Sequence, residues 1–175
     1  MGNAKAADEM IILFSRVLRK TLSRSDEFID LESEIDTIRD YVELQKLRYS
    51  DAIEVACDMD AESGSVRIPT FILQPFVENA IFHNADFCKT IRIRILCRVS
   101  GRLLTIVIAD NGKGMTRRQI DTALSRGMAY NKVGISNVHE RLQLTYGAAY
   151  GLEIQSDGVG GTQVLIRIPI EHGGG

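Results

Sequence analysis

The segment Ile106–Met115 limits the fold and the chemistry of this chain more than any other. It reads IVIADNGKGM, an apolar run that ends in the acid Asp110 and is followed by Gly112 and Gly114. Such a run predicts a strand. The carboxylate at its end could accept a hydrogen bond from the exocyclic amine of a flat ligand. The glycines, which lack a Cβ atom, would let that ligand lie against the main chain. The alternative is ordinary Asp-Asn-Gly turn chemistry.

The composition limits the environment and the partners of the chain. Of its 175 residues, 45% are hydrophobic and 25% are charged, which allows one domain with its own core and an additional helical segment. A net charge of -2 gives no electrostatic sign of nucleic acid or of an anionic membrane. Three cysteines without a C-x-x-C pair favour a reduced, cytosolic protein over a disulfide framework or a zinc site. No apolar run approaches the ~20 residues of a membrane-spanning helix.

Two helices are predicted in residues 4–49. Residues 4–25 carry apolar side chains at three- and four-residue spacing, and a second stripe begins after an N-cap at Asp30 and continues to Tyr49. These helices either pack against the following domain or form a dimer seam, and both alternatives stay open. The seam residues would be Met10, Leu13, Phe14 and Val17.

Strands and helices are predicted to alternate from residue 50 to residue 170. The predicted strands are 52–58, 90–100 and 103–110, with a closing hairpin at 151–156 and 162–168. Helices are predicted around 117–124, from Ile68 to His83, and from Asn137 to Tyr146, the last with Val138, Leu142 and Leu144 inward. This order predicts an α+β fold, a two-layer sandwich in which a mixed, mostly antiparallel sheet has helices on one face.

Polar side chains interrupt the most apolar of these helices. Glu78 and Asn79 lie in its middle, and an unpaired buried amide costs on the order of 1 to 3 kcal/mol, so both need partners. Either they bind the backbone of a neighbouring loop, or Asn79 gives a neutral oxygen to a Mg²⁺ ion that phosphates hold. His83 lies one helical turn further on the same face. Beside Asn79, it is interpreted as a ligand contact.

Two glycine-containing segments are further candidates. Residues 133–137 directly precede a predicted helix, whose free N–H groups would attract an anion, although a capping turn explains them equally well. The irregular segment 116–132 would be a lid if this loop and the Asp110 loop face one ligand. Gly160-Gly161-Thr162 is either a simple hairpin turn or a way to bring the Thr162 hydroxyl beside Asp110.

Four motifs in this order resemble the Bergerat-type ATP-binding domain of sensor histidine kinases, type II topoisomerases, Hsp90 and mismatch-repair ATPases. They are Glu-Asn-Ala-Ile-x-His (78–83), Asp-Asn-Gly-x-Gly-Met (110–115), Gly-Ile-x-Asn-Val-x-x-Arg-Leu (134–142) and Gly-Gly-Thr (160–162). Leu-Gln-Pro-x-Val-Glu-Asn-Ala (73–80), preceded by YVELQKLRY (41–49), is similar to histidine kinases of the LytS/YehU type. The resemblance covers about residues 8–170.

The resemblance implies roles for single residues. Asn79 would coordinate Mg²⁺, and Asp110 would bind the adenine amine of ATP, helped by Thr162 through a water molecule. The base pocket would include Met115, with Gly112 and Gly114 permitting the approach. Phosphate contacts would come from Gly134, Ile135 and Asn137. Glu78 is implied as the catalytic residue that orients the attacking group or the waters of the metal.

Positions 82, 84 and 132 depart from the family pattern, and position 75 differs from the hydrolytic relatives. Position 82, often basic in this group, is Phe82, and position 84, often glycine, is Asn84, so one phosphate contact is expected to be missing. Lys132 replaces the first glycine of the phosphate loop, where it would stiffen the lid or add a charge to the phosphates. Hydrolytic relatives carry a glutamate one turn before the metal asparagine, whereas Pro75 occupies that turn here, so we expect slow or no hydrolysis of ATP.

The resemblance also implies the context of the chain. No phosphoacceptor motif surrounds His139 or His172, so the acceptor histidine is expected upstream of residue 1. Residues 4–49 would be a partial dimerisation arm, and 50–170 the catalytic domain. The partners would be ATP or ADP, a response regulator receiver domain and a second copy of the chain, in the cytoplasmic portion of a membrane-anchored sensor. The alternatives are a serine kinase of the anti-sigma-factor type and a degenerate interaction domain of the same fold.

Overall fold

The two strands predicted in residues 90–110 form a hairpin, and apolar and polar residues alternate along most of the first one. In the computed structural model, which describes residues 27–49, 52–84, 88–125 and 133–170, strand β4 (Ile91–Ser100) pairs antiparallel with β5 (Leu103–Asp110). The isoleucines of β4 are buried against the helices, while Arg92 and Arg94 are exposed on the other face. One face of this strand therefore belongs to the core, and the other carries exposed arginines.

Five strands form the main sheet, in the order β2-β4-β5-β7-β6. Strand β2 (Ile53–Met59) is parallel to β4, and the pairs of β5 with β7 (Thr162–Pro169) and of β7 with β6 (Leu152–Gln155) are antiparallel. The prediction of a mixed, mostly antiparallel sheet is confirmed. The register places Asp110 directly opposite Thr162, because the end of β5 pairs with the start of β7.

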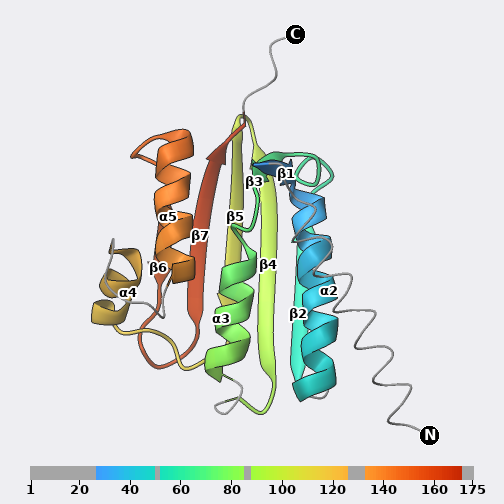
Figure 1. Ribbon diagram of the computed structural model, residues 1–175, viewed down its shortest axis with the longest axis vertical. Coiled ribbons are helices and arrows are strands. Elements are labelled where there is room, and N and C mark those ends of the chain that lie inside the picture. Colours follow the sequence, from blue (N-terminus) through green and yellow to red (C-terminus); the bar gives the residue numbers. More distant parts are fainter. Residues whose placement is uncertain (1–26, 50–51, 85–87, 126–132, 171–175) are drawn as a thin grey trace, which may run out of the picture.

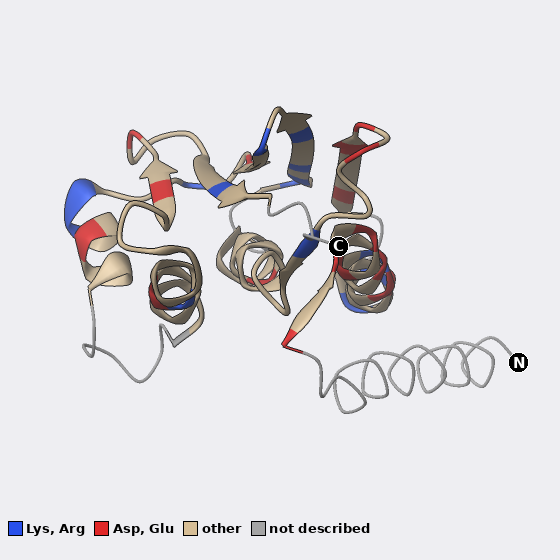
Figure 2. Cartoon of the chain, turned by 90° about the horizontal axis from the view of Figure 1, so that it is seen from above, with Lys and Arg blue, Asp and Glu red and all other residues tan. Residues whose placement is uncertain are grey.

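Three helices cover one face of this sheet: α2 (Leu31–Tyr49), α3 (Gln74–Asn84) and α5 (Val133–Tyr146). Figure 1 shows them side by side in front of the strands, and the view from above in Figure 2 places them in a separate row, so the molecule has the two predicted layers. The short helix α4 (Arg117–Leu124) contacts α5. None of the helices in the described residues is both long and apolar enough to cross a membrane.

Helix α2 is part of the same core as the sheet. Its residues Leu31, Ile35 and Ile38 are completely buried, and they belong to one apolar cluster with the inward side chains of β4, β5 and β7. Of the two alternatives for the helical arm, packing against the following domain therefore applies to α2. The first predicted helix, residues 4–25, and the proposed seam within it lie outside the described residues.

The predicted start of the third helix at Ile68 is wrong. Residues Arg67–Pro69 form a short strand, β3, which pairs with β1 (Phe28–Asp30), a strand that the sequence analysis did not predict. Phe71 then adopts a positive φ of 59°, which a helix does not accommodate. The helix begins only at Gln74, so Pro75 lies in the first turn, where a missing N–H costs least.

The carboxylate of Glu34 in α2 explains where α3 begins. It accepts hydrogen bonds from the backbone N–H groups of Phe71 (3.0 Å) and Leu73 (2.7 Å), and a longer one from Gln74 (3.4 Å). The first N–H groups of a helix have no partner within it, and a negative charge at this end is favourable. Glu34 is 1% exposed, so these hydrogen bonds form a buried connection between α2 and the start of α3.

Two expectations about the last helix are also wrong. It begins at Val133 and not at Asn137, so Gly134, Ile135 and Asn137 lie within its first turns and not in a loop before it. Leu144 is 75% exposed, whereas Val138 and Leu142 are buried as expected. The four-residue spacing from Val138 to Leu142 stays on the buried side of the helix, and Leu144 falls on the solvent side.

Candidate functional site

The carboxylate of Asp110 is held in place at the end of β5. One of its oxygens accepts the N–H of Gly112 (2.7 Å), and the backbone N–H of Thr162 also binds it. Burial raises the pKa of Asp110, and these two hydrogen bonds oppose that rise because they favour the charged form. A carboxylate has about four lone-pair sites, so it keeps capacity for a donor from a ligand.

The turn beside Asp110 depends on Gly161. This residue has a φ of 77°, and a Cβ atom on it would lie 2.2 Å from the carbonyl oxygen of Asp110. Its N–H donates to the carbonyl of Gly112 at 2.6 Å. The second glycine of Gly-Gly-Thr is therefore required by close contact between two backbones, whereas the Cβ of a residue at Gly160 would meet no atom within 4 Å.

Ser156 joins this turn to the segment after Asp110, and sequence reasoning missed it. Its hydroxyl accepts the N–H of Met115 (2.8 Å) and donates to the carbonyl of Gly161 (2.6 Å). The same hydroxyl lies 2.8 Å from where a Cβ on Gly114 would be, and Gly114 has a φ of 75°. Ser156 lies in a polar loop, where nothing in the sequence separates it from a solvent-exposed serine.

Asn84 fixes the opposite side of the same segment. At the end of α3 its amide donates to the carbonyl of Ala80 (2.8 Å), and its oxygen accepts the N–H of Lys113 (3.0 Å). A Cβ on Gly112 would lie within 2.1 to 2.3 Å of the amide of Asn84. The structure thus explains Gly112 by its packing on Asn84, and the asparagine at position 84 connects α3 to the Asp110 segment.

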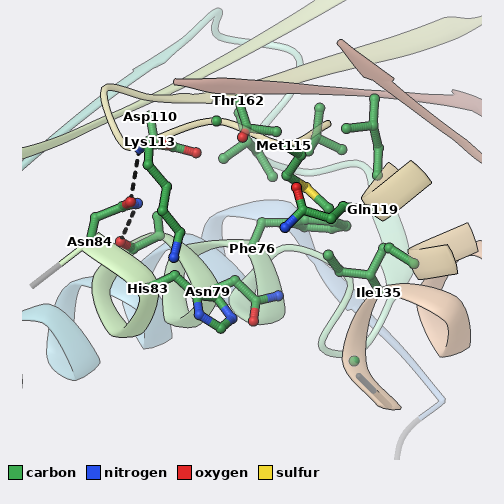
Figure 3. A pocket seen from close by; sticks show the side chains of 17 residues that line it. Phe76, Asn79, His83, Asn84, Asp110, Lys113, Met115, Gln119, Ile135 and Thr162 are labelled. Atoms are coloured by element: carbon green, nitrogen blue, oxygen red, sulfur yellow. Dashed lines mark hydrogen bonds between the residues drawn. The ribbon is translucent and has the colours of Figure 1, made fainter. Parts of the chain in front are cut away.

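These segments surround a cavity of about 260 Å³ between α3, the end of β5 and the start of α5. Figure 3 shows Asp110 and Thr162 on one side of it, Asn79 and His83 on α3 across from them, and Met115 and Ile135 beside Phe76. Eight of the predicted site residues line this cavity: Asn79, His83, Asp110, Gly114, Met115, Gly134, Ile135 and Thr162. The tertiary structure therefore brings residues of all four motifs of the resemblance to one place.

Of the other four predicted site residues, three lie in the described part of the chain and do not line the cavity: Gly112, Asn137 and Glu78. Gly112 packs on Asn84, and Asn137 is exposed on α5. Glu78 accepts a hydrogen bond from the side chain of Gln74 (2.7 Å) and lies toward Tyr41 of α2, whose pKa is raised to about 12 by burial first and by Glu78 second. Lys132 lies outside the described residues.

Further lining residues were not predicted from the sequence. The apolar ones are the inward side chains of helices and strands, which only the packing of α3, α4, β5, β6 and β7 brings together: Phe76, Ala80, Ile108, Ala123, Ile154 and Val164. The polar ones are Asn84, Lys113 and Gln119. Gln119 also forms the capping box of α4 with Thr116, so the helix start and the cavity wall share one side chain.

No group of three His, Cys, Asp or Glu side chains is placed to hold a metal ion in the part of the chain that the structure describes. The amide oxygen of Asn79 could hold a metal in this cavity together with oxygens that a ligand brings. That division is typical of Mg²⁺ with phosphates, where the protein supplies only one or two ligands.

Two family models match the chain. The model described as "Histidine kinase-, DNA gyrase B-, and HSP90-like ATPase" matches residues 64–172. The chain belongs to this ATPase family. A second model, described as "Histidine kinase", matches residues 1–53.

Curated relatives and solved structures agree with this family. The chain is 31% identical over 169 residues to the sensor histidine kinase YesM of Bacillus subtilis and 34% identical over 169 residues to the sensor histidine kinase YpdA of Escherichia coli. These matches cover 96% and 95% of this chain but only 28% and 29% of those proteins.

The fold matches the catalytic domain of histidine kinase ThkA with a TM-score of 0.62 at 15% identity, over 82% of this chain and 95% of that one. It also matches Acinetobacter baumannii histidine kinase AdeS with a TM-score of 0.63 at 13% identity, over 93% and 77%. The expected ATP-binding fold is confirmed.

Proposed function

We propose that this chain is the ATP-binding catalytic portion of a sensor histidine kinase. The observation that carries the proposal is the carboxylate of Asp110, which is held by two backbone N–H groups opposite Thr162 and faces a cavity whose far side is formed by Asn79 and His83. The family models and the relatives named sensor histidine kinases support the same function.

Each side of the cavity would take one part of the nucleotide. Asp110 would accept the exocyclic amine of adenine, with Thr162 beside it, and Met115 and Ile135 would pack on the faces of the base. The phosphates would extend toward α3, where the amide oxygen of Asn79 is a suitable neutral ligand for Mg²⁺. When bound there, Mg²⁺ would neutralise charge on the phosphates during transfer.

The phosphoryl group would pass to a histidine that residues 1–175 do not supply. In this step the bond between the γ-phosphorus and the ADP oxygen breaks, and a bond from that phosphorus to an imidazole nitrogen forms. A neutral imidazole already has a lone pair, so positioning matters more than a base. His139 is occupied, because its Nδ1 accepts the N–H of Leu152 at 3.0 Å. His83 lies in the cavity itself and is assigned to the ligand.

The wider context belongs to the same proposal. The chain spans less than a third of the length of YesM and YpdA, so the activity of the whole protein is inferred from theirs. We infer a homodimer, a response regulator receiver domain as the acceptor of the phosphoryl group from the histidine, and a membrane-anchored sensor with this portion in the cytoplasm.

Calorimetric titration of ADP with Mg²⁺ tests the nucleotide site. We expect wild-type protein to bind in the micromolar range and Asp110→Asn to bind at least about tenfold more weakly. The substitution replaces a charged acceptor by an amide, and a hydrogen bond to a charged group contributes about 1.5 to 3 kcal/mol. Asp58→Asn is the matched control, because Asp58 is an exposed acid on β2, the edge strand next to β4 and not next to β5.

Either of two results would contradict this proposal. If wild-type protein binds no adenine nucleotide, the motifs serve another purpose, and the interaction-domain alternative becomes the better explanation. If Asp110→Asn and Asp58→Asn bind like wild type, the nucleotide does not lie against Asp110. Transfer of the phosphoryl group to serine of an added protein would instead favour the serine-kinase alternative.

A further inference from the structure

We propose that Lys113 is a phosphate-binding residue of this site, the cation that holds the polyphosphate of the nucleotide against α3. The inference rests on the proposed function and assigns a role to a residue that neither the motifs nor the fold assigns. It begins with the backbone. The N–H of Lys113 donates to Asn84 at 3.0 Å, and Asn84 is 5% exposed and also bound to Ala80, so the main chain of Lys113 is fixed to the end of α3.

The side chain of Lys113 extends into the cavity from this fixed point. Figure 3 shows it running from the Asp110 side toward α3, with its amine on the side of the cavity where His83 and Asn79 lie. Asp110 and Thr162 mark the opposite side, which the proposed function gives to the base. The amine of Lys113 therefore reaches the part of the cavity that would hold phosphates.

Lys113 is the only Lys or Arg among the described residues that line the cavity. The position on α3 where a basic residue was expected carries Phe82, whose side chain is 74% exposed and does not line the cavity. A triphosphate brings several negative charges, and bound phosphates in proteins are commonly neutralised by lysine as a point charge. The segment that holds Asp110 thus supplies both the contact to the base and the cation for the phosphates.

The test compares ligands that differ only in phosphate. Binding of adenosine, ADP with Mg²⁺ and a non-hydrolysable ATP analogue with Mg²⁺ is measured by calorimetry for wild type, Lys113→Met and Lys113→Arg. We expect Lys113→Met to weaken the binding of ADP and of the ATP analogue roughly tenfold. Its affinity for adenosine should stay within about twofold of the wild-type value. Lys113→Arg should keep most of the affinity, and the loss in Lys113→Met should shrink at high salt, because exposed charges are screened.

Arg102→Met is the matched control, because it also removes one positive charge. Arg102 lies in the turn between β4 and β5, at the end of β5 opposite to Asp110, and should leave all three affinities unchanged. Equal affinity of Lys113→Met and wild type for ADP would overturn the proposal, and so would an equal loss for adenosine and ADP. Failure of wild type to bind adenosine or ADP would instead contradict the proposed function itself, so the two failures are distinguishable.

Discussion

At the scale of single residues, His139 shows how a histidine of a motif can be structural. It lies in α5, within Gly-Ile-x-Asn-Val-x-x-Arg-Leu, and its Nδ1 accepts the N–H of Leu152 at the start of β6. A Cβ on Gly151 would lie 2.8 Å from the imidazole ring, so the helix and the strand meet tightly here. Only a neutral imidazole has a free lone pair on this nitrogen, and burial lowers the pKa of His139 below its ordinary value of 6.5.

This contact predicts a pH dependence of stability. Because the pKa of His139 is lower in the folded state, the unfolded chain binds a proton more readily. The contribution of His139 to the free energy of unfolding is therefore complete above about pH 6.5, and it is lost as the pH falls below that value. We expect the free energy of unfolding to decrease between about pH 7 and pH 5, with a slope of at most about 1.4 kcal/mol per pH unit from this group.

Urea denaturation at several pH values measures the effect. In His139→Gln this part of the slope should disappear. The control His83→Gln should keep it, because His83 is an exposed residue on α3 and does not make this contact. The interpretation would be wrong if His139→Gln retained the full pH dependence of the wild type.

At the scale of elements, the hydrogen bonds of Glu34 determine where α3, one wall of the cavity, begins. The carboxylate of Glu34 accepts hydrogen bonds from the N–H groups of Phe71 and Leu73, which lie 37 and 39 residues further along the sequence. On the other side, Arg141 of α5 donates to the carbonyls of Thr70 (2.5 Å) and Glu27 (3.2 Å). Arg141, the arginine of the third motif, therefore helps to hold the segment before α3 in place.

We expect Glu34→Ala to destabilise the protein by roughly 2 to 4 kcal/mol, because it leaves buried N–H groups of this segment without an acceptor. The control is Glu43→Ala on the same helix. Glu43 makes an exposed ion pair with Lys46, whose loss should cost less than about 1 kcal/mol. Chemical denaturation of the two variants gives both values. Equal destabilisation would show that the Glu34 contact adds nothing specific.

These contacts explain what could be predicted from the sequence and what could not. The strands β4 and β5 and the acid at the end of β5 were predicted, because alternation and a polar residue after an apolar run are local signals. The start of α3 was not, because it depends on Glu34, which is distant in the chain. The site residues divide in the same way into those with a local signal and those without one. Asp110 and Asn79 were predicted because they are polar residues next to or within apolar runs. Ser156 and Lys113 lie in polar segments, and their hydrogen-bond partners are distant in the sequence.

At the scale of the whole molecule, α2 and the sheet share one core although the predicted division of the chain falls at residue 50. Four side chains of α2 are at most 3% exposed: Leu31, Ile35, Ile38 and Val42. Burial of one such side chain contributes about 1.5 to 3 kcal/mol, so together they contribute roughly 6 to 12 kcal/mol. Domains are typically stable by only about 5 to 15 kcal/mol.

We therefore expect a chain of residues 50–175 not to fold cooperatively, whereas residues 27–175 should fold. Removal of α2 would expose the inward side chains of β2 that it covers, and it would also leave α3 without Glu34. Circular dichroism with thermal denaturation of the two shortened chains measures the difference. A sharp unfolding transition in residues 50–175 would show that the sheet, α3 and α5 are sufficient alone.

The hydrogen bonds of Glu34 also have a mechanical consequence. A helix without buried side chains could rotate about its axis or slide along the sheet. Helix α2 can do neither without withdrawing Ile35 and Ile38 from the core and Glu34 from the start of α3. A displacement of α2 would therefore carry the start of α3 and the sheet with it. Under the proposed function, a nucleotide in the cavity would then move relative to the acceptor histidine while the geometry of its site stays the same.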